Sequence, residues 1–220
     1  MGIELAVPDD DERLRNLVGG IESSSRRLRN LINDLAEFSQ VGRRAKPLAP
    51  ASLREIAQEV VADLHQRIDE AAASVEIDAL PVVHCDHNQM RQVLQNLLSN
   101  AIKYRHPDRR CHIRIFAAAG REEEYRGDGT RSSATRVCVG DNGIGFDPKY
   151  AEQIFEPFQR LHGPDAYEGS GIGLAICRKI VQRHGGTVGA ETLHGLGSTF
   201  WFTLAAAPEN KALAPDRPPS

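Results

Sequence analysis

Three glycine-rich turns follow a stretch that carries two asparagines one helical turn apart, and this order constrains the fold more than any other feature. The asparagines are Asn96 and Asn100. The turns are DNGIGF at 141–146, GSGIGLA at 169–175 and GLGST at 195–199. Glycine permits positive φ and lets the backbone approach a neighbouring group closely. The sequence therefore predicts a pocket with a helix as its floor and flexible backbone as its walls.

A long amphipathic helix is expected over residues 10–42, ahead of these motifs. Apolar residues recur at alternating spacings of three and four from Leu14 to Phe38, interrupted by Ser24, which makes an a/d seam held over about four heptads. The seam stops before a linker expected at 43–51, so its apolar side needs a partner from outside the domain. Packing of this helix on its own domain is the alternative.

Helical and extended patterns are mixed beyond the linker. From apolar periodicity and end signals, helices are expected from Ser52 to about Ala73, from Asp86 through Ala101 and from about Ile172 to His184. Strands are expected at 75–77, 82–83, 113–115, 137–139, 187–191 and 198–204. The polar segment 121–136 predicts a long solvated hairpin loop. The tail at 207–220, with four prolines, predicts disorder.

Composition and charge exclude several classes of protein. The formal net charge of −3 favours neither nucleic acid nor an anionic membrane as a partner. We find no run of about 18 apolar residues, so we expect no membrane span and no direct membrane contact. The first residues lack the features of a secretory signal. The four cysteines form no CxxC pair, which is typical of buried, reduced thiols in a cytosolic protein.

The expected helix with the two asparagines carries groups suited to a metal and to phosphate. Asn96, Asn100 and Lys103 share one stripe beside its apolar face. An asparagine amide oxygen suits Mg²⁺, which prefers oxygen ligands and shares phosphate oxygens. A lysine ammonium can bind phosphate as a point charge. Taken alone, the three residues could equally be the solvated side of a helix.

The first glycine-rich turn carries a carboxylate where a strand ends. Asp141 follows the expected strand TRVCV, and a carboxylate there can accept a hydrogen bond from an exocyclic amine, such as that of adenine. Gly143 and Gly145 remove side chains where a flat ring would approach the backbone. A plain turn between strand and helix is the alternative for this motif alone.

The second glycine-rich turn opens a helix, and the free N–H groups of a helix start attract anions. A dinucleotide-binding GxGxxG motif is disfavoured because GSGIGL follows a long loop rather than a strand. The Walker pattern, with lysine after the last glycine, is absent. The third turn, GLGST, is either another pocket wall or a simple hairpin loop. Together the elements predict a site for a nucleoside triphosphate and its metal.

Residues 52–205 resemble the catalytic, ATP-binding domain of bacterial sensor histidine kinases. This is the Bergerat, or GHKL, nucleotide fold, which is shared with gyrase, mismatch-repair ATPases and one class of chaperone. The resemblance rests on QVLQNLLSNAIKY at 92–104, DNGIGF, IFEPFQRL at 154–161, GSGIGLAICRKIVQRHGG and GSTFWF at 197–202. The segment NLINDLAEFSQVGR at 30–43 resembles the second dimerisation helix of these kinases, and the ending RLH resembles their phytochrome-like branch.

The resemblance implies an α+β fold. It would be a two-layer α/β sandwich, with a mixed sheet and helices on one face, preceded by a long bundle-type helix. The ATP-binding domain would cover 52–206. Residues 10–42 would be the second helix of a dimerisation and phosphotransfer bundle whose first helix is absent from this chain. ATP and Mg²⁺ are the implied cofactors.

The resemblance also places the phosphate chemistry. Asn100 would ligate Mg²⁺, and Asn96, Lys103 and Arg160 would act as catalytic groups around the phosphates. In the hydrolysing relatives a glutamate stands where this chain has Asn96, and it activates water. Because an amide is a poor base, transfer to another nucleophile is favoured over hydrolysis. A partly deprotonated imidazole is a good acceptor at neutral pH, and positioning with electrostatic stabilisation would supply most of the rate.

The adenine end and the lid are implied in the same way. Asp141 would accept the hydrogen bond of the adenine amine, with Thr199 in support directly or through water. Phe155 and Phe158 would anchor a lid at about 147–168. The remaining contacts with ATP would come from Tyr104, Gly143, Gly145, Gly169, Gly171, Ile172, Gly173 and Leu174.

The implied phosphate acceptor is a histidine that this chain lacks. The family places it on a first helix, followed by an acidic residue and soon after by a proline, and none of the eight histidines fits. The implied partners are a helix that bears the acceptor histidine, a response regulator, and a second copy that forms a homodimer through the helix bundle. No nucleic-acid partner is expected. The implied location is the cytoplasm, and a tether to a membrane through a sensor region is compatible with it.

Two other functions are kept as alternatives. One is an ATP-dependent regulatory module, such as an anti-sigma-like kinase or a non-catalytic partner, against which the long helix argues. The other is an ATP hydrolase of the gyrase class, against which Asn96 argues.

Overall fold

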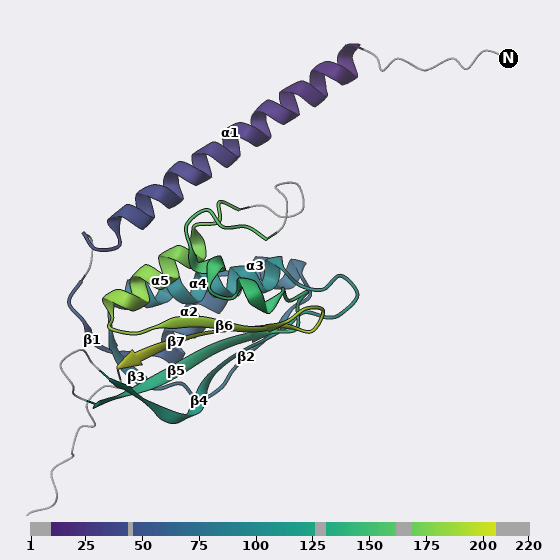
Figure 1. Ribbon diagram of the computed structural model, residues 1–220. Coiled ribbons are helices and arrows are strands. Elements are labelled where there is room, and N and C mark those ends of the chain that lie inside the picture. Colours follow the sequence, from purple (N-terminus) through teal and green to yellow (C-terminus); the bar gives the residue numbers. More distant parts are fainter. Residues whose placement is uncertain (1–9, 44–45, 126–130, 162–168, 206–220) are drawn as a thin grey trace, which may run out of the picture.

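A five-stranded mixed sheet forms one layer of the molecule, in the order β2-β4-β5-β7-β6 (Figure 1). The computed structural model describes residues 10–43, 46–125, 131–161 and 169–205. The strands are β2 (Ser74–Ile77), β4 (His112–Tyr125), β5 (Arg131–Asp141), β6 (Val188–Leu193) and β7 (Gly197–Ala205). Strands β2 and β4 are parallel, and the other neighbours are antiparallel. A second, two-stranded sheet pairs β1 (Ala49–Ser52) with β3 (Val82–Cys85).

Helices form the second layer and cover one face of the sheet (Figure 1). They are α2 (Leu53–Asp63), α3 (His65–Glu70), α4 (His87–Lys103) and α5 (Gly173–Arg183), with short 3₁₀ turns η1 (Pro148–Tyr150) and η2 (Gln153–Phe155). The expected S-x-x-E start is present, because Ser52 Oγ accepts a hydrogen bond from the Glu55 N–H group. The buried face of α4 packs into a core that the inner faces of β4, β5 and β7 complete. The predicted α+β sandwich with helices on one face is thus confirmed.

Two elements differ from their predictions. The helix expected from Ser52 to about Ala73 is interrupted at Leu64, and Ala72 turns the chain with a φ of 47°. The segment 121–136 is mostly strand rather than loop, because β4 and β5 pair from Arg121↔Thr135 to Tyr125↔Arg131. Main-chain pairing along the hairpin outweighs the polar composition there.

The linker and the chain ends can be compared only in part. Residues 49–51 of the expected linker form most of β1. The expected disordered tail at 207–220 and residues 162–168 of the expected lid lie outside the described residues.

Helix α1 (Asp10–Gln40) extends away from the two layers over most of its length (Figure 1). Its seam is exposed at Leu14, Leu17, Ile21, Leu28 and Leu35, and so are the neighbouring apolar residues Val18 and Ile32. The last turns differ, since Leu31 and Phe38 pack against the core and Val41, just beyond the helix, is buried. The end of α1 thus packs on its own domain, and the rest of its apolar side is exposed. In the described part of the chain, no helix has an apolar stretch long enough to cross a lipid bilayer.

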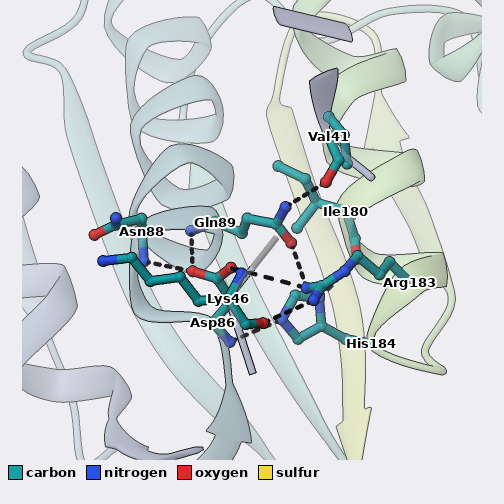
Figure 2. A network of polar contacts seen from close by, with 8 residues as sticks. All are labelled: Val41, Lys46, Asp86, Asn88, Gln89, Ile180, Arg183 and His184. Carbon is teal, nitrogen blue, oxygen red and sulfur yellow. Dashed lines mark hydrogen bonds and ion pairs between the residues drawn. The ribbon is translucent and has the colours of Figure 1, made fainter. Parts of the chain in front are cut away.

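A buried carboxylate joins the start of α4 to the segment after α1 (Figure 2). Asp86 is 2% exposed. Its Oδ1 caps α4 by accepting hydrogen bonds from the Asn88 and Gln89 N–H groups. Its Oδ2 accepts a hydrogen bond of 2.7 Å from the Lys46 N–H group and lies 3.9 Å from Arg183 of α5. One carboxylate thereby caps the start of α4, binds the linker and lies near a cationic side chain of α5.

The same network contains a neutral histidine and a bridging amide (Figure 2). His184 Nε2 accepts a hydrogen bond of 3.0 Å from the Asp86 N–H group, and its Nδ1 lies 2.7 Å from the Ile180 carbonyl oxygen. This pattern fits the tautomer with the proton on Nδ1, and burial lowers the pKa of the ring. Gln89 Nε2 donates to the Val41 carbonyl oxygen at 2.7 Å. The segment after α1 is therefore held on the α4–α5 side of the domain.

We expect Asp86→Ala to lower the free energy of unfolding by about 3 kcal/mol, because it removes the α4 cap and the anionic partner of Arg183. Urea denaturation measures the change. Asp63→Ala is the matched control, since Asp63 pairs with Arg91 at the surface and exposed pairs contribute about 0–1 kcal/mol. Equal losses in the two variants would contradict the central role of Asp86.

Candidate functional site

Two adjoining cavities open beside α4 and share the side chain of Asn100. The inner cavity, of about 80 Å³, is lined by Asn100, Tyr104, Asp141, Ile144, Gly145, Phe146, Ile154, Gln159, Arg160, Leu161, Leu174, Ser198 and Phe200. The outer cavity, of about 350 Å³, is lined by Asp34, Arg67, Asn96, Ser99, Asn100, Lys103, Tyr104, Ile154, Gln159, Arg160, Gly169, Ser170, Gly171, Gly173 and Leu174. A small, mostly apolar cavity therefore adjoins a larger cavity with more polar walls.

The inner cavity contains one carboxylate among mostly apolar walls. Asp141 lies at the end of β5, opposite Ser198 of β7. Its Oδ1 accepts a hydrogen bond of 2.8 Å from the Gly143 N–H group. Burial raises the pKa of Asp141 to about 6, although hydrogen bonds from the Gly143 and Ser198 backbones act in the opposite direction. A mostly apolar cavity with a single carboxylate suits a flat heterocycle that carries an amine.

One wall of this cavity is formed by the backbone of residues 144–146, which contacts the chain at residues 192–195. Gly145 has a φ of 58°, and a Cβ atom there would lie 2.2 Å from the Leu193 carbonyl oxygen. The Gly195 N–H group donates to the Ile144 carbonyl oxygen at 2.7 Å, and the Phe146 N–H group donates to Thr192 Oγ1 at 3.0 Å. Glycine is therefore required at Gly145 by both its conformation and its surroundings. The first and third glycine-rich turns meet here, as the sequence predicted.

Arg109, in the connection after α4, braces this wall and was missed by the sequence analysis. One of its terminal nitrogens donates to the Gly143 carbonyl oxygen at 3.1 Å and to the Gly195 carbonyl oxygen at 2.8 Å. The side chain therefore connects the two turns, from positions that are 34 and 86 residues before the contacted glycines. No motif marks this arginine, because its role arises from contacts that are distant along the chain.

The outer cavity gathers cationic side chains at the start of a helix. Lys103, Arg160 and Arg67 line it, and so does the glycine-rich segment that leads into α5. Lys103 Nζ donates to the Tyr104 hydroxyl at 2.8 Å. Asn96 Nδ2 donates to the Gly173 carbonyl oxygen at 3.1 Å, which joins α4 to the first residue of α5. Positive side chains and a helix N-terminus together favour a polyanion in this cavity.

Most of the expected contact residues line the two cavities. The outer cavity includes Asn96, Lys103, Gly169, Gly171 and Gly173, the inner one includes Asp141 and Gly145, and both include Asn100, Tyr104, Arg160 and Leu174. Gly143 and Ile172 line neither cavity. A Cβ atom at Gly143 would lie 2.4 Å from the Tyr104 carbonyl oxygen, and Ile172 is buried in the core.

Two expected residues do not have the positions assigned to them. Thr199 is paired with Gly140, and its Oγ1 is 3.4 Å from where a Cβ of Gly140 would lie. Ser198 lines the inner cavity in its place, because successive residues of a strand face opposite sides. Phe158 is 55% exposed with a φ of 65°, so it is not a buried anchor. Phe155 is buried and contacts the ring of Phe200, as an anchor would.

Comparison with known proteins agrees with this geometry. The family model described as "Histidine kinase-, DNA gyrase B-, and HSP90-like ATPase" matches residues 85–208. The phytochrome-like protein Cph1 of Synechocystis sp. is 36% identical over 194 residues, which are 88% of this chain and 24% of Cph1. The chain spans about a quarter of the length of Cph1 and of the cyanobacterial phytochromes A and B of Nostoc sp..

Two solved structures have a fold similar to that of this chain. Full-length ShkA in complex with AMPPNP has a TM-score of 0.65 at 28% identity, over 88% of this chain and 39% of that chain. The histidine kinase ThkA in complex with the response regulator protein TrrA has a TM-score of 0.61 at 26% identity, over 92% of this chain and 54% of that chain.

The chain belongs to this ATPase family, since the family model covers more than half of its length. Within the family, it contains the ATP-binding catalytic domain of a two-component sensor histidine kinase.

The raised pKa of Asp141 predicts opposite effects on binding and on stability. We expect adenosine to bind several-fold more weakly as the pH falls through about 6, because the carboxylate becomes protonated. Asp141→Asn should lower the affinity about tenfold at neutral pH and flatten this dependence. Because the folded-state pKa is raised, this group's stabilising contribution is complete below about pH 4 and is lost as the pH rises through about 6. The variant should therefore stabilise the ligand-free fold above pH 6 by about 1–2 kcal/mol.

Calorimetric titration with adenosine from about pH 5 to about pH 8, paired with thermal unfolding, measures both effects. Adenosine avoids the titration of phosphate groups. A variant that binds adenosine as well as the wild type at neutral pH would contradict the assignment of Asp141.

Proposed function

We propose that this domain binds ATP with Mg²⁺ and transfers the γ-phosphate to a histidine on a separate helix. The observation that carries the proposal is the continuity of the two cavities through Asn100. A base in the inner cavity, next to Asp141, would place its phosphates beside the cations of the outer cavity. Lys103 and Arg160 would then hold the phosphates, with Arg160 able to reach the γ-phosphate.

The residues of the outer cavity fit a magnesium ion that is held largely by the nucleotide. In the part of the chain that the structure describes, no group of three or more His, Cys, Asp or Glu side chains could hold a metal. The Asn100 amide oxygen is a suitable single protein ligand, and Mg²⁺ commonly takes its remaining ligands from phosphate and water. When bound, the ion would neutralise charge that develops on the phosphates.

The contact made by Asn96 supports transfer rather than hydrolysis. Its amide nitrogen donates to the Gly173 carbonyl oxygen, so the side chain holds the start of α5 in place. A neutral amide does not accept a proton from water at ordinary pH. The chain therefore has no general base at the position where the hydrolysing relatives carry glutamate, and an external nucleophile is favoured.

The partners we propose are a second copy of the bundle helix, a helix with the acceptor histidine, and a response regulator. The exposed seam of α1 supports association with other helices. The ThkA structure was solved in complex with the response regulator protein TrrA, which supports the third partner by analogy.

A transfer assay tests the proposed reaction. We expect this chain, given ATP labelled at the γ-phosphate, to label a supplied dimerisation segment of a related kinase that carries its acceptor histidine. Asn100→Ala should reduce the labelling at least a hundredfold, because the metal loses its protein ligand. A segment with alanine in place of its histidine is the control. Label on serine, or steady phosphate release without transfer, would favour one of the alternative functions.

A second experiment tests the role of the α1 seam. We expect Leu28→Glu to weaken self-association at least tenfold, because a charge would enter the apolar seam. Analytical ultracentrifugation across a concentration series measures it. Arg26→Glu, also exposed on α1, is the control for the added charge. A chain that is monomeric at every concentration in the wild type would contradict the dimer.

A further inference from the structure

A carboxylate from outside the catalytic domain lies at the outer cavity. Asp34 belongs to α1, yet it lines the cavity together with Asn100, Lys103 and Arg160. Ser170 Oγ donates a short hydrogen bond to Asp34 Oδ2, across 136 residues of sequence. Asp34 belongs to the segment 30–43 that resembles a dimerisation helix, and the roles assigned to the nucleotide site leave it unused.

Ser170 lies shortly before α5, so its contact with Asp34 shows which part of the outer cavity the carboxylate reaches. The same Oγ accepts a hydrogen bond of 3.2 Å from the Ile172 N–H group, directly before α5. Asp34 therefore reaches the glycine-rich segment at the positive end of a helix, which favours an anion. With cationic side chains around the same cavity, the Asp34 carboxylate lies where the nucleotide's phosphates are expected to bind.

The end of α1 is attached firmly enough to keep Asp34 there. Lys179 Nζ of α5 donates to the Phe38 carbonyl oxygen at 2.8 Å and lies 4.2 Å from the centre of the Phe38 ring. Beyond the helix, Gln89 holds the Val41 carbonyl oxygen at 2.7 Å, and Arg183 holds the Lys46 carbonyl oxygen at 2.8 Å (Figure 2). These contacts lie four to twelve residues after Asp34, so they restrict its movement away from the cavity.

We propose that Asp34 is an affinity-determining residue of the nucleotide site, which competes with the phosphates for the segment that leads into α5. The proposal rests on the proposed function of the two cavities. Its physical basis is repulsion between like charges in a partly enclosed cavity. The docked α1 therefore weakens the binding of polyphosphate groups and leaves the adenine end unaffected. By linkage, bound nucleotide weakens the docking of α1 by the same factor.

The test compares ligands of different charge on the full chain. We expect Asp34→Asn to tighten the binding of AMPPNP with Mg²⁺ by about tenfold at low salt, to tighten ADP less, and to leave adenosine unchanged. The gain should shrink at high salt, because screening weakens the repulsion. Asp34→Ala should act in the same direction. Glu22→Gln is the matched control, since Glu22 is an exposed acid on the same helix.

Hydrogen exchange provides a readout that does not depend on affinity. We expect AMPPNP to increase amide exchange over residues 31–41 in the wild type, as α1 loosens from the domain. Adenosine should cause no such increase, because it carries no phosphate.

Three outcomes would overturn the inference. An unchanged ratio of AMPPNP to adenosine affinity in both Asp34 variants, with adenosine still bound, would overturn it alone. Weaker AMPPNP binding that depends on Mg²⁺ would show that Asp34 is a metal ligand instead of a competitor. Failure of adenosine, ADP and AMPPNP to bind either wild type or variant would overturn the proposed function, and the inference with it.

Discussion

The buried carboxylate of Asp86 is the constraint on which the rest of this structure depends. It begins α4 by capping it, and α4 provides Asn96, Asn100 and Lys103 to the site. The carboxylate also lies near Arg183, and the Asp86 main-chain N–H group donates to His184, so the same residue contacts the end of α5. The start of α5 follows the second glycine-rich turn. A buried charge is costly unless its own atoms are hydrogen-bonded or paired with an opposite charge. The arrangement of two helices and a linker around Asp86 meets that requirement, and it places the two sides of the outer cavity relative to each other.

The site separates two kinds of recognition into two environments. The inner cavity is narrow and mostly apolar, and burial there raises the pKa of its single carboxylate, Asp141. The outer cavity is wider and includes Lys103, Arg160 and Arg67, whose positive charges suit a polyanion. Asn100 and Arg160 line both. Because the two cavities differ in this way, the affinity for the base and the affinity for the phosphates can change independently. Asp34 lines only the outer cavity, so we expect it to affect the affinity for the phosphates alone.

The sequence predicted best those features that depend on local patterns. The cap and apolar periodicity of α4 and the helix after the second glycine-rich turn follow from short-range rules. The predictions from the sequence were wrong in two places. One depended on which of two adjacent strand residues faces the cavity, and the other on how far two strands pair. Thr199 was chosen over Ser198, although adjacent strand residues face opposite sides and Ser198 shares the side of Phe200. The polar hairpin of β4 and β5 was taken for a loop, because composition does not report backbone pairing.

The sequence by itself determined the family, the order of the elements and most of the residues that line the two cavities, because those are encoded in motifs of a few neighbouring positions. The tertiary structure alone decided that Arg109 braces two turns and that Asp34 reaches Ser170. These contacts join residues that are 34 to 136 positions apart. No spacing along the chain specifies such a pair, since it exists only after helices and sheet have packed and brought the two side chains together.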